Sequence, residues 1–146
     1  MSIDSKLAEL GITLPEAPAP AANYVPYVIS GKMLFVSGQI SGLKGRLGDD
    51  LGVDQGAEAA RGCGLSLLAQ ARAALGSLDR VVRVVKLGGF VNSTADFTDQ
   101  PEVINGCSNL MVEVFGDKGR HARAAVSAPA LPRGVAVEIE AIFEIE

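Results

Sequence analysis

Residues 119–146 read GRHARAAVSAPALPRGVAVEIEAIFEIE, and this stretch decides the fold of the chain. From Val135 onward, apolar and polar side chains alternate with the period of two that is typical of a half-buried strand. A turn at residues 131–134 separates this strand, residues 135–144, from an earlier one that begins near Arg120. We therefore expect a pair of C-terminal strands. The apolar row of the second strand consists of Val135, Val137, Ile139, Ala141, Phe143 and Ile145.

Basic side chains lie immediately before and within the first of these strands. They are Arg120, His121 and Arg123, and the opposite row of the second strand carries Glu138 and Glu140. A guanidinium group is the side chain best shaped to hold a carboxylate through two parallel hydrogen bonds. The pattern therefore favours a pocket for a small molecule that bears a carboxylate. We interpret His121 as a loop residue more readily than as a proton shuttle.

The rest of the chain predicts alternating short strands and helices. A short helix over residues 4–10 and a Pro- and Ala-rich connector come first, and we expect both at the surface. The order that follows is β-β-α-β-α-β-β, which is an α+β arrangement with two helices on one face of a mixed sheet. The predicted division is an N-terminal extension, 1–22, and one domain, 23–146. The predicted elements are strands at 27–29 and 33–37, a helix at 54–75, a strand at 81–92 and a helix from Thr98 or Asp99 to Phe115.

The strand at 81–92, VVRVVKLGGFVN, is apolar on both faces. Such a strand is usually covered on both sides, and one layer of helices covers only one. Another subunit is the simplest cover for the second side. Gly62 and Gly64 weaken the helix before it, and we expect them to allow close approach to the sheet.

Composition narrows the function classes. A net charge of −4 and a pI of about 5.0 disfavour an extended nucleic-acid surface. No apolar run approaches the ~20 residues of a membrane helix, and the N-terminus does not resemble a secretion signal, so we expect a cytoplasmic protein. Cys63 and Cys107 are interpreted as buried free thiols, and one histidine without clustered cysteines predicts no metal site. The loop at 41–54 is glycine-rich but lacks the phosphate-binding pattern, so we expect a flexible connection.

Several motifs resemble one family. They are Pro26-Tyr27, Phe35 to Ile40 (FVSGQI), Arg80 to Lys86 leading to Phe90-Val91-Asn92, Asn109, Glu113 and Phe115, Ala122-Arg123, Leu131-Pro132, and Val137 to Ile142 (VEIEAI). As a set they are similar to the RidA (YjgF) group of imine and enamine deaminases, some of whose members carry older names such as L-PSP endoribonuclease or translation inhibitor. The resemblance covers residues 23–146.

This resemblance implies a chorismate-mutase-like fold, a homotrimer and a pocket at each subunit interface. It implies a hydrolase like the 2-iminobutanoate/2-iminopropanoate deaminases, which converts 2-imino or 2-enamino acids to 2-keto acids and ammonia without a cofactor. Arg123 would hold the substrate carboxylate and Glu138 would place the attacking water. Tyr27 would match the pocket tyrosine, and main-chain groups at Ala125 and Ser37-Gly38 would complete the site.

The chain also departs from the family pattern. His121 stands where proline is common, Ala124 replaces a serine or threonine, and the loop at 41–54 differs. These departures leave open a second hypothesis, a non-catalytic trimer that binds or senses small carboxylate metabolites. RNA cleavage is a third hypothesis that follows only from older family names, and the negative charge disfavours it.

Overall fold

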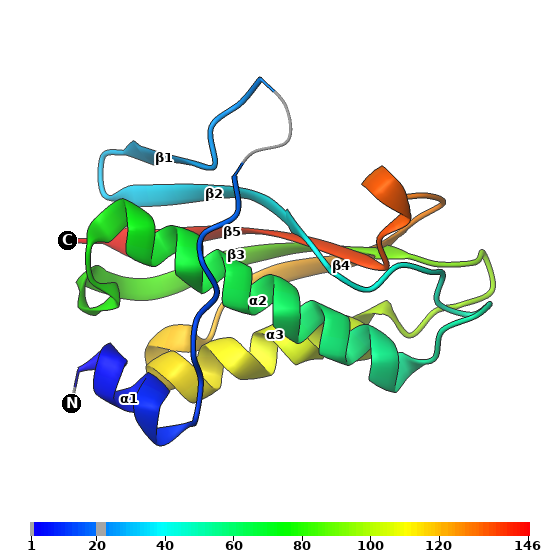
Figure 1. Ribbon diagram of the computed structural model, residues 1–146, viewed down its shortest axis with the longest axis horizontal. Coiled ribbons are helices and arrows are strands. Elements are labelled where there is room, and N and C mark those ends of the chain that lie inside the picture. The colour runs from blue at the N-terminus through cyan, green and yellow to red at the C-terminus, as the bar shows by residue number, and fades with distance from the viewer. Residues whose placement is uncertain (1, 20–22) are drawn as a thin grey trace.

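The computed structural model describes residues 2–19 and 23–146, and it contains one five-stranded mixed sheet with two long helices on one face (Figure 1). The spatial order of the strands is β1-β2-β5-β3-β4. The α+β class and the order of the elements along the chain are therefore confirmed. The strands are β1 (Tyr27–Ser30), β2 (Met33–Ile40), β3 (Val81–Asn92), β4 (Ala122–Ala128) and β5 (Val137–Ile145), and the helices are α1 (Ile3–Glu9), α2 (Val53–Leu75) and α3 (Gln100–Phe115), with short 3-10 turns η1 (Leu78–Arg80), η2 (Gly116–Gly119) and η3 (Pro132–Gly134).

The alternating C-terminal strand, β5, is the centre of the sheet. It pairs antiparallel with β2 on one side and with β3 on the other. Its apolar row faces the helices and is buried from Val137 to Ile145, as the alternation predicted. Every residue of this row is at most 4% exposed, so β5 forms the floor of the hydrophobic core.

The two C-terminal strands do not pair with each other, which corrects the prediction of a strand pair. β3 lies between them, parallel to β4 and antiparallel to β5. The reason is the helix α3, because parallel neighbours such as β3 and β4 need a long crossover connection, and α3 provides it. The turn at residues 131–134 then carries the chain past the end of β3 to β5.

The helices cover one face of the sheet and touch each other closely. α2 packs over β2 and β5, while α3 packs over β3 and β4. A Cβ atom on Gly64 would lie 2.8 Å from Leu110 Cδ2 of α3, so this glycine allows close approach of the neighbouring helix. The prediction that it allows close approach of the sheet is wrong. Gly62 has no atom within 4 Å of its hypothetical Cβ, and Gly106 of α3 is pressed against the Ala57 carbonyl oxygen.

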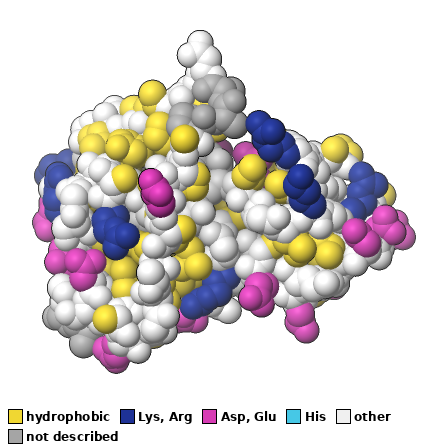
Figure 2. All heavy atoms as spheres, viewed as in Figure 1, with side chains coloured by type: hydrophobic (Ala, Val, Ile, Leu, Met, Phe, Trp, Pro, Cys, Tyr) yellow, Lys and Arg dark blue, Asp and Glu magenta, His cyan; other side chains and the backbone are white. Residues whose placement is uncertain are grey.

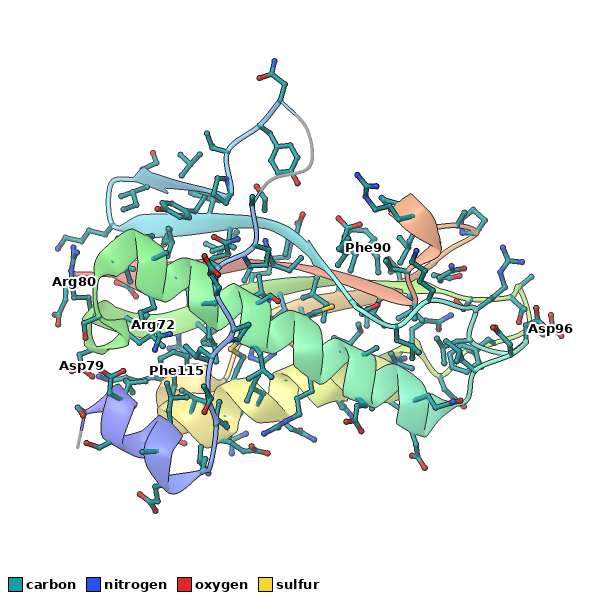
Figure 3. The ribbon with its side chains drawn as sticks, in the orientation of Figure 1. Arg72, Asp79, Arg80, Phe90, Asp96 and Phe115 are labelled. Atoms are coloured by element: carbon teal, nitrogen blue, oxygen red, sulfur yellow. The ribbon has the colours of Figure 1, made fainter. Side chains whose placement is uncertain are left out.

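The N-terminal segment is part of the packed structure. Leu7 and Leu14 are buried in the core cluster, although the sequence suggested a surface segment. The Ile3 N–H donates to Asp79 Oδ1 at 2.7 Å and fixes the start of α1 beside η1 (Figure 3). The end of the predicted connector, residues 20–22, lies outside the described residues, and the division of the chain at residue 23 stays a prediction.

The second face of the sheet is not covered within one chain. Large apolar side chains stand on it, among them Phe90, which is 36% exposed, and Phe35, which is 43% exposed. Figure 3 labels Phe90 on the side of the sheet away from the helices. An apolar sheet face of this kind marks an interaction surface.

Gly106→Ala tests the contact between the helices. An added methyl at this position must displace the α2 backbone at Ala57, and overpacking of this kind costs about 1–3 kcal/mol. Gly62→Ala, an exposed position in α2, is the matched control and should gain about 0.5–1 kcal/mol from helix propensity. Urea unfolding measures both, and equal stabilities of the two variants would contradict the close packing of α2 on α3.

Candidate functional site

Arg123 lies on the edge strand β4, on the helix side of the sheet. Its side chain is half-buried, and its guanidinium donates to Ser108 Oγ at 3.1 Å and to the Pro101 carbonyl oxygen at 3.3 Å. Neither partner carries a charge, and no acidic side chain among residues 2–19 and 23–146 pairs with it. A cavity of about 270 Å³ opens beside the guanidinium, lined by Asn105, Ser108, Asn109, Val112, Arg120, His121 and Arg123.

His121 and Ser108 form a hydrogen-bonded pair in the same cavity. Ser108 Oγ lies 2.9 Å from His121 Nε2, and His121 Nδ1 lies 2.6 Å from the Gly119 carbonyl oxygen. A carbonyl oxygen can only accept, so Nδ1 carries the proton and the bare Nε2 of the neutral ring accepts from the serine hydroxyl. Burial lowers the pKa of His121, Arg123 lowers it further, and the bond to Gly119 acts in the opposite direction. The ring is therefore neutral near pH 7.

Glu138 lines a second cavity, of about 200 Å³, which Gln39 of β2 and Gln70 of α2 also line. Its neighbours there include Gly38, Arg133 and Tyr24. Burial raises the pKa of Glu138, and the nearby Glu140 carboxylate adds to the rise. A carboxyl group with this environment is a candidate proton acceptor at pH values nearer neutrality than an exposed glutamate.

The two predicted key residues do not meet within one chain. Arg123 is aligned with Leu87 on the helix side of β3, whereas Glu138 is aligned with Phe90 on the uncovered side. Since successive side chains of a strand point to opposite faces, the sheet itself separates them. Only a second copy of the chain could bring a Glu138 to an Arg123.

Of the remaining predicted residues, Gly38 lines the Glu138 cavity, whereas Ala125 and Tyr27 pack against the core. Gly38 lies against Glu138, because a Cβ on residue 38 would overlap the Glu138 carboxylate, and Ser37 Oγ donates to the Val25 carbonyl at 2.8 Å. Ala125 is on the same face as Arg123 and packs partly against the core. Tyr27 also packs against the core and does not line the Glu138 cavity.

The two cavities also contain residues that the sequence analysis did not single out. Tyr24 and Arg133 line the Glu138 cavity, and the backbone of Arg133 has a left-handed conformation with φ 60°. Ser108 carried no sequence signal, because its partners are 13 and 15 residues away on another element. The one available hint was His121 itself, as the chain's single histidine.

Metal ligands, thiols and membrane-spanning helices were also considered from the sequence. In the described part of the chain, no three His, Cys, Asp or Glu residues are grouped to hold a metal ion. Both cysteines are buried free thiols, as predicted, and burial raises the pKa of Cys107 to about 12. Within the same residues, none of the helices is both long and apolar enough to span a bilayer.

Comparison with known proteins places the chain in a family. Residues 4–143 match the family described as "YjgF/chorismate mutase-like, putative endoribonuclease". Protein TCP17 of Trypanosoma cruzi is 51% identical over 150 aligned positions, which cover 98% of this chain and 94% of that protein. The chain belongs to the YjgF (RidA) family. The match begins at residue 4, so the family's homology includes the N-terminal segment that the sequence resemblance had left out.

Solved structures show which YjgF proteins this chain resembles in shape. The Agrobacterium tumefaciens protein Atu1372 is 48% identical with a TM-score of 0.92, covering 99% of this chain and 92% of that one. A Shewanella oneidensis structure is 32% identical with a TM-score of 0.96, covering 99% and 100%. Escherichia coli TdcF, solved with bound serine, is 26% identical over 90% and 94% of the chains with a TM-score of 0.65. The chain is thus nearer in shape to the first two than to TdcF.

Glu138→Gln tests the environment of the second cavity. Because the folded state raises the pKa of this carboxyl, ionisation of Glu138 opposes folding above that raised value and has no effect below the ordinary glutamate pKa of about 4.3. Glutamine mimics the protonated form. We expect E138Q to melt at a higher temperature than the wild type at pH 7–8, and the difference to vanish near pH 4.

Glu113→Gln is the control for this measurement. Glu113 forms an exposed ion pair with Arg61 at 3.2 Å, a kind of pair worth about 0–1 kcal/mol, so its removal should give no stabilisation at pH 7. A lower melting temperature for E138Q than for the wild type at pH 7–8 would contradict the raised pKa of Glu138.

Proposed function

We propose that the protein is a hydrolase that deaminates 2-imino and 2-enamino acids to 2-keto acids and ammonia. The observation that carries this proposal is Arg123, a half-buried guanidinium that opens onto a cavity and has no acidic partner among the described residues. Such a group suits a ligand carboxylate, because charge-assisted bidentate pairs are among the strongest hydrogen bonds in proteins. The serine bound to the relative TdcF is a small carboxylate-bearing molecule of the same class.

The chemistry requires an anchored carboxylate and a base near the imine carbon. In the proposed trimer, Arg123 of one protomer holds the substrate carboxylate and Glu138 of a neighbour orients a water molecule toward the C=N carbon. Holding both reactants in position supplies much of the rate, and the raised pKa of Glu138 brings its basicity nearer to the working pH. The opposite placement of Arg123 and Glu138 in one chain supports a site built from two copies.

RNA cleavage, which the family description names, has less support in this chain. The net charge is −4, and the row of β5 on the uncovered face of the sheet carries Glu138, Glu140 and Glu144. A nucleic-acid site gains most of its affinity from Lys and Arg contacts to phosphates. Basic and acidic side chains are interspersed over the face drawn in Figure 2.

The deaminase assay changes Arg123 and follows release of ammonia and keto acid while a dehydratase generates the imino acid in situ. Arg123→Lys should lower kcat/KM by about 10- to 100-fold, since a point charge loses the paired, charge-assisted bonds worth about 1.5–3 kcal/mol. Arg123→Ala should lose more, whereas Arg61→Lys, at the exposed ion pair with Glu113, should keep wild-type turnover.

One result of this assay would decide against the proposal. Wild-type protein that does not accelerate ammonia release is not a deaminase for that substrate. If it is nevertheless stabilised thermally by keto acids in an Arg123-dependent way, the chain is the non-catalytic carboxylate binder considered from the sequence.

The trimer is tested by Phe90→Asp on the uncovered face of the sheet. Wild-type protein should have a molar mass three times 15.1 kDa by light scattering. F90D places a carboxylate next to Glu138 on β5, so it should give the single-chain mass with an unchanged far-UV spectrum. Leu10→Asp, at an exposed apolar position outside the sheet, is the control and should remain assembled. Assembled F90D would contradict an interface on this face.

A further inference from the structure

Arg123 has a potential proton acceptor beside it within its own chain. Ser108 Oγ bridges the Arg123 guanidinium, at 3.1 Å, and the bare His121 Nε2, at 2.9 Å. The Gly119 carbonyl fixes the imidazole tautomer from the other side at 2.6 Å. A hydroxyl, a neutral base and a group that orients the base are the arrangement that activates an oxygen for nucleophilic or proton-transfer chemistry.

We propose that Ser108 and His121 form a proton-transfer pair for the substrate that Arg123 holds by its carboxylate. This inference rests on the proposed function and deepens it, because it assigns proton transfer to residues of the same chain as the anchor. Both residues line the cavity that opens at the guanidinium. Glu138, on the other face of the sheet, cannot serve this role within one chain.

The step balances without any further reactant. As a water molecule attacks the imine carbon, its oxygen forms the new C–O bond and the C=N double bond becomes a single bond. Glu138 of the neighbouring protomer accepts a hydrogen bond from one hydrogen of this water and orients it, and the other proton of the water passes to Ser108 Oγ while the serine proton passes to His121 Nε2. The imidazolium then returns its proton, through Ser108, to the nitrogen. The proton of the new C–OH group then passes through the same pair to the nitrogen while the C–N bond breaks, so ammonia leaves, the keto-acid carbonyl forms and both side chains are restored.

The positive charges around His121 favour its neutral form, and a bound anion makes protonation of the ring easier. Arg123 faces it from β4, and Arg120 precedes it, paired with Asp117 of η2 at 3.5 Å. From β3, Arg83 donates to the Arg120 carbonyl oxygen at 2.8 Å. The α3 side of the cavity contributes Asn105, Ser108, Asn109 and Val112, none of which is charged. A bound carboxylate offsets this positive surplus and should favour the imidazolium.

The first experiment is an NMR titration of the imidazole, with pyruvate as the probe ligand. His121 is the chain's one histidine, so its resonances need no assignment by mutation. Without ligand, the pKa should lie below the ordinary value of about 6.5, and pyruvate should raise it. In Arg123→Ala the rise with pyruvate should be absent. A titration unchanged by pyruvate in the wild type, or an equal rise in R123A, overturns the proposal.

The second experiment compares His121→Asn, Ser108→Ala and Ser108→Thr in the deaminase assay. Asparagine can keep the hydrogen bond to the Gly119 carbonyl but supplies no base, so H121N should lower kcat by roughly 100-fold with a smaller change in KM. It should also abolish the acid limb of the pH–rate profile. S108A should lose kcat, and S108T, which keeps the hydroxyl, should recover part of it.

These outcomes separate the inference from the proposed function. If E138Q is inactive while H121N keeps wild-type kcat and an unchanged acid limb, the protein is a deaminase and the Ser108–His121 proposal fails. If the wild type shows no turnover, the deaminase proposal fails, and the NMR titration alone decides whether His121 is coupled to an anion on Arg123.

Discussion

The structure depends on one strand with two different neighbours. β5 pairs with β2 and with β3, and its strict alternation sends one row of side chains into the core and the other to the opposite face. A register slip of one residue would bury the glutamates and expose Phe143, so the hydrophobic effect pins the alignment of every other strand. The position of Glu138 follows from this register, and so does the row of apolar and acidic side chains on the uncovered face.

The insertion of β3 between β4 and β5 determines what one chain can do alone. It places Arg123 on the far edge of the sheet, under α3, and leaves Glu138 on the other side. Two cavities result, each with its own charged and proton-accepting groups. A ligand that needs both Arg123 and Glu138 requires a second protomer, whereas a ligand in the α3 cavity meets Arg123, Ser108 and His121 together.

Local sequence patterns predicted the helices and strands. The order of the strands in the sheet and the contacts between distant residues depend on long-range packing, which these patterns do not show. The alternation of residues 135–145 and the helical spacing of α2 and α3 are properties of neighbouring residues, so the sequence revealed them. The placement of β3 between β4 and β5 is a matter of topology, which turn residues at 131–134 do not encode. The bond between Ser108 and His121 joins a helix to the start of a strand. No periodicity marks such a contact.

Burial in the two cavities shifts the pKa values of Glu138 and His121 toward each other. Burial raises the pKa of Glu138 and lowers that of His121, because in each case it disfavours the charged form. The rise brings the pKa of the Glu138 carboxyl closer to the neutral range, whereas the fall in the pKa of His121 favours the neutral ring, which is the form that accepts a proton. Gly38 leaves open the space that the Glu138 carboxylate occupies, because a Cβ atom on residue 38 would overlap that carboxylate.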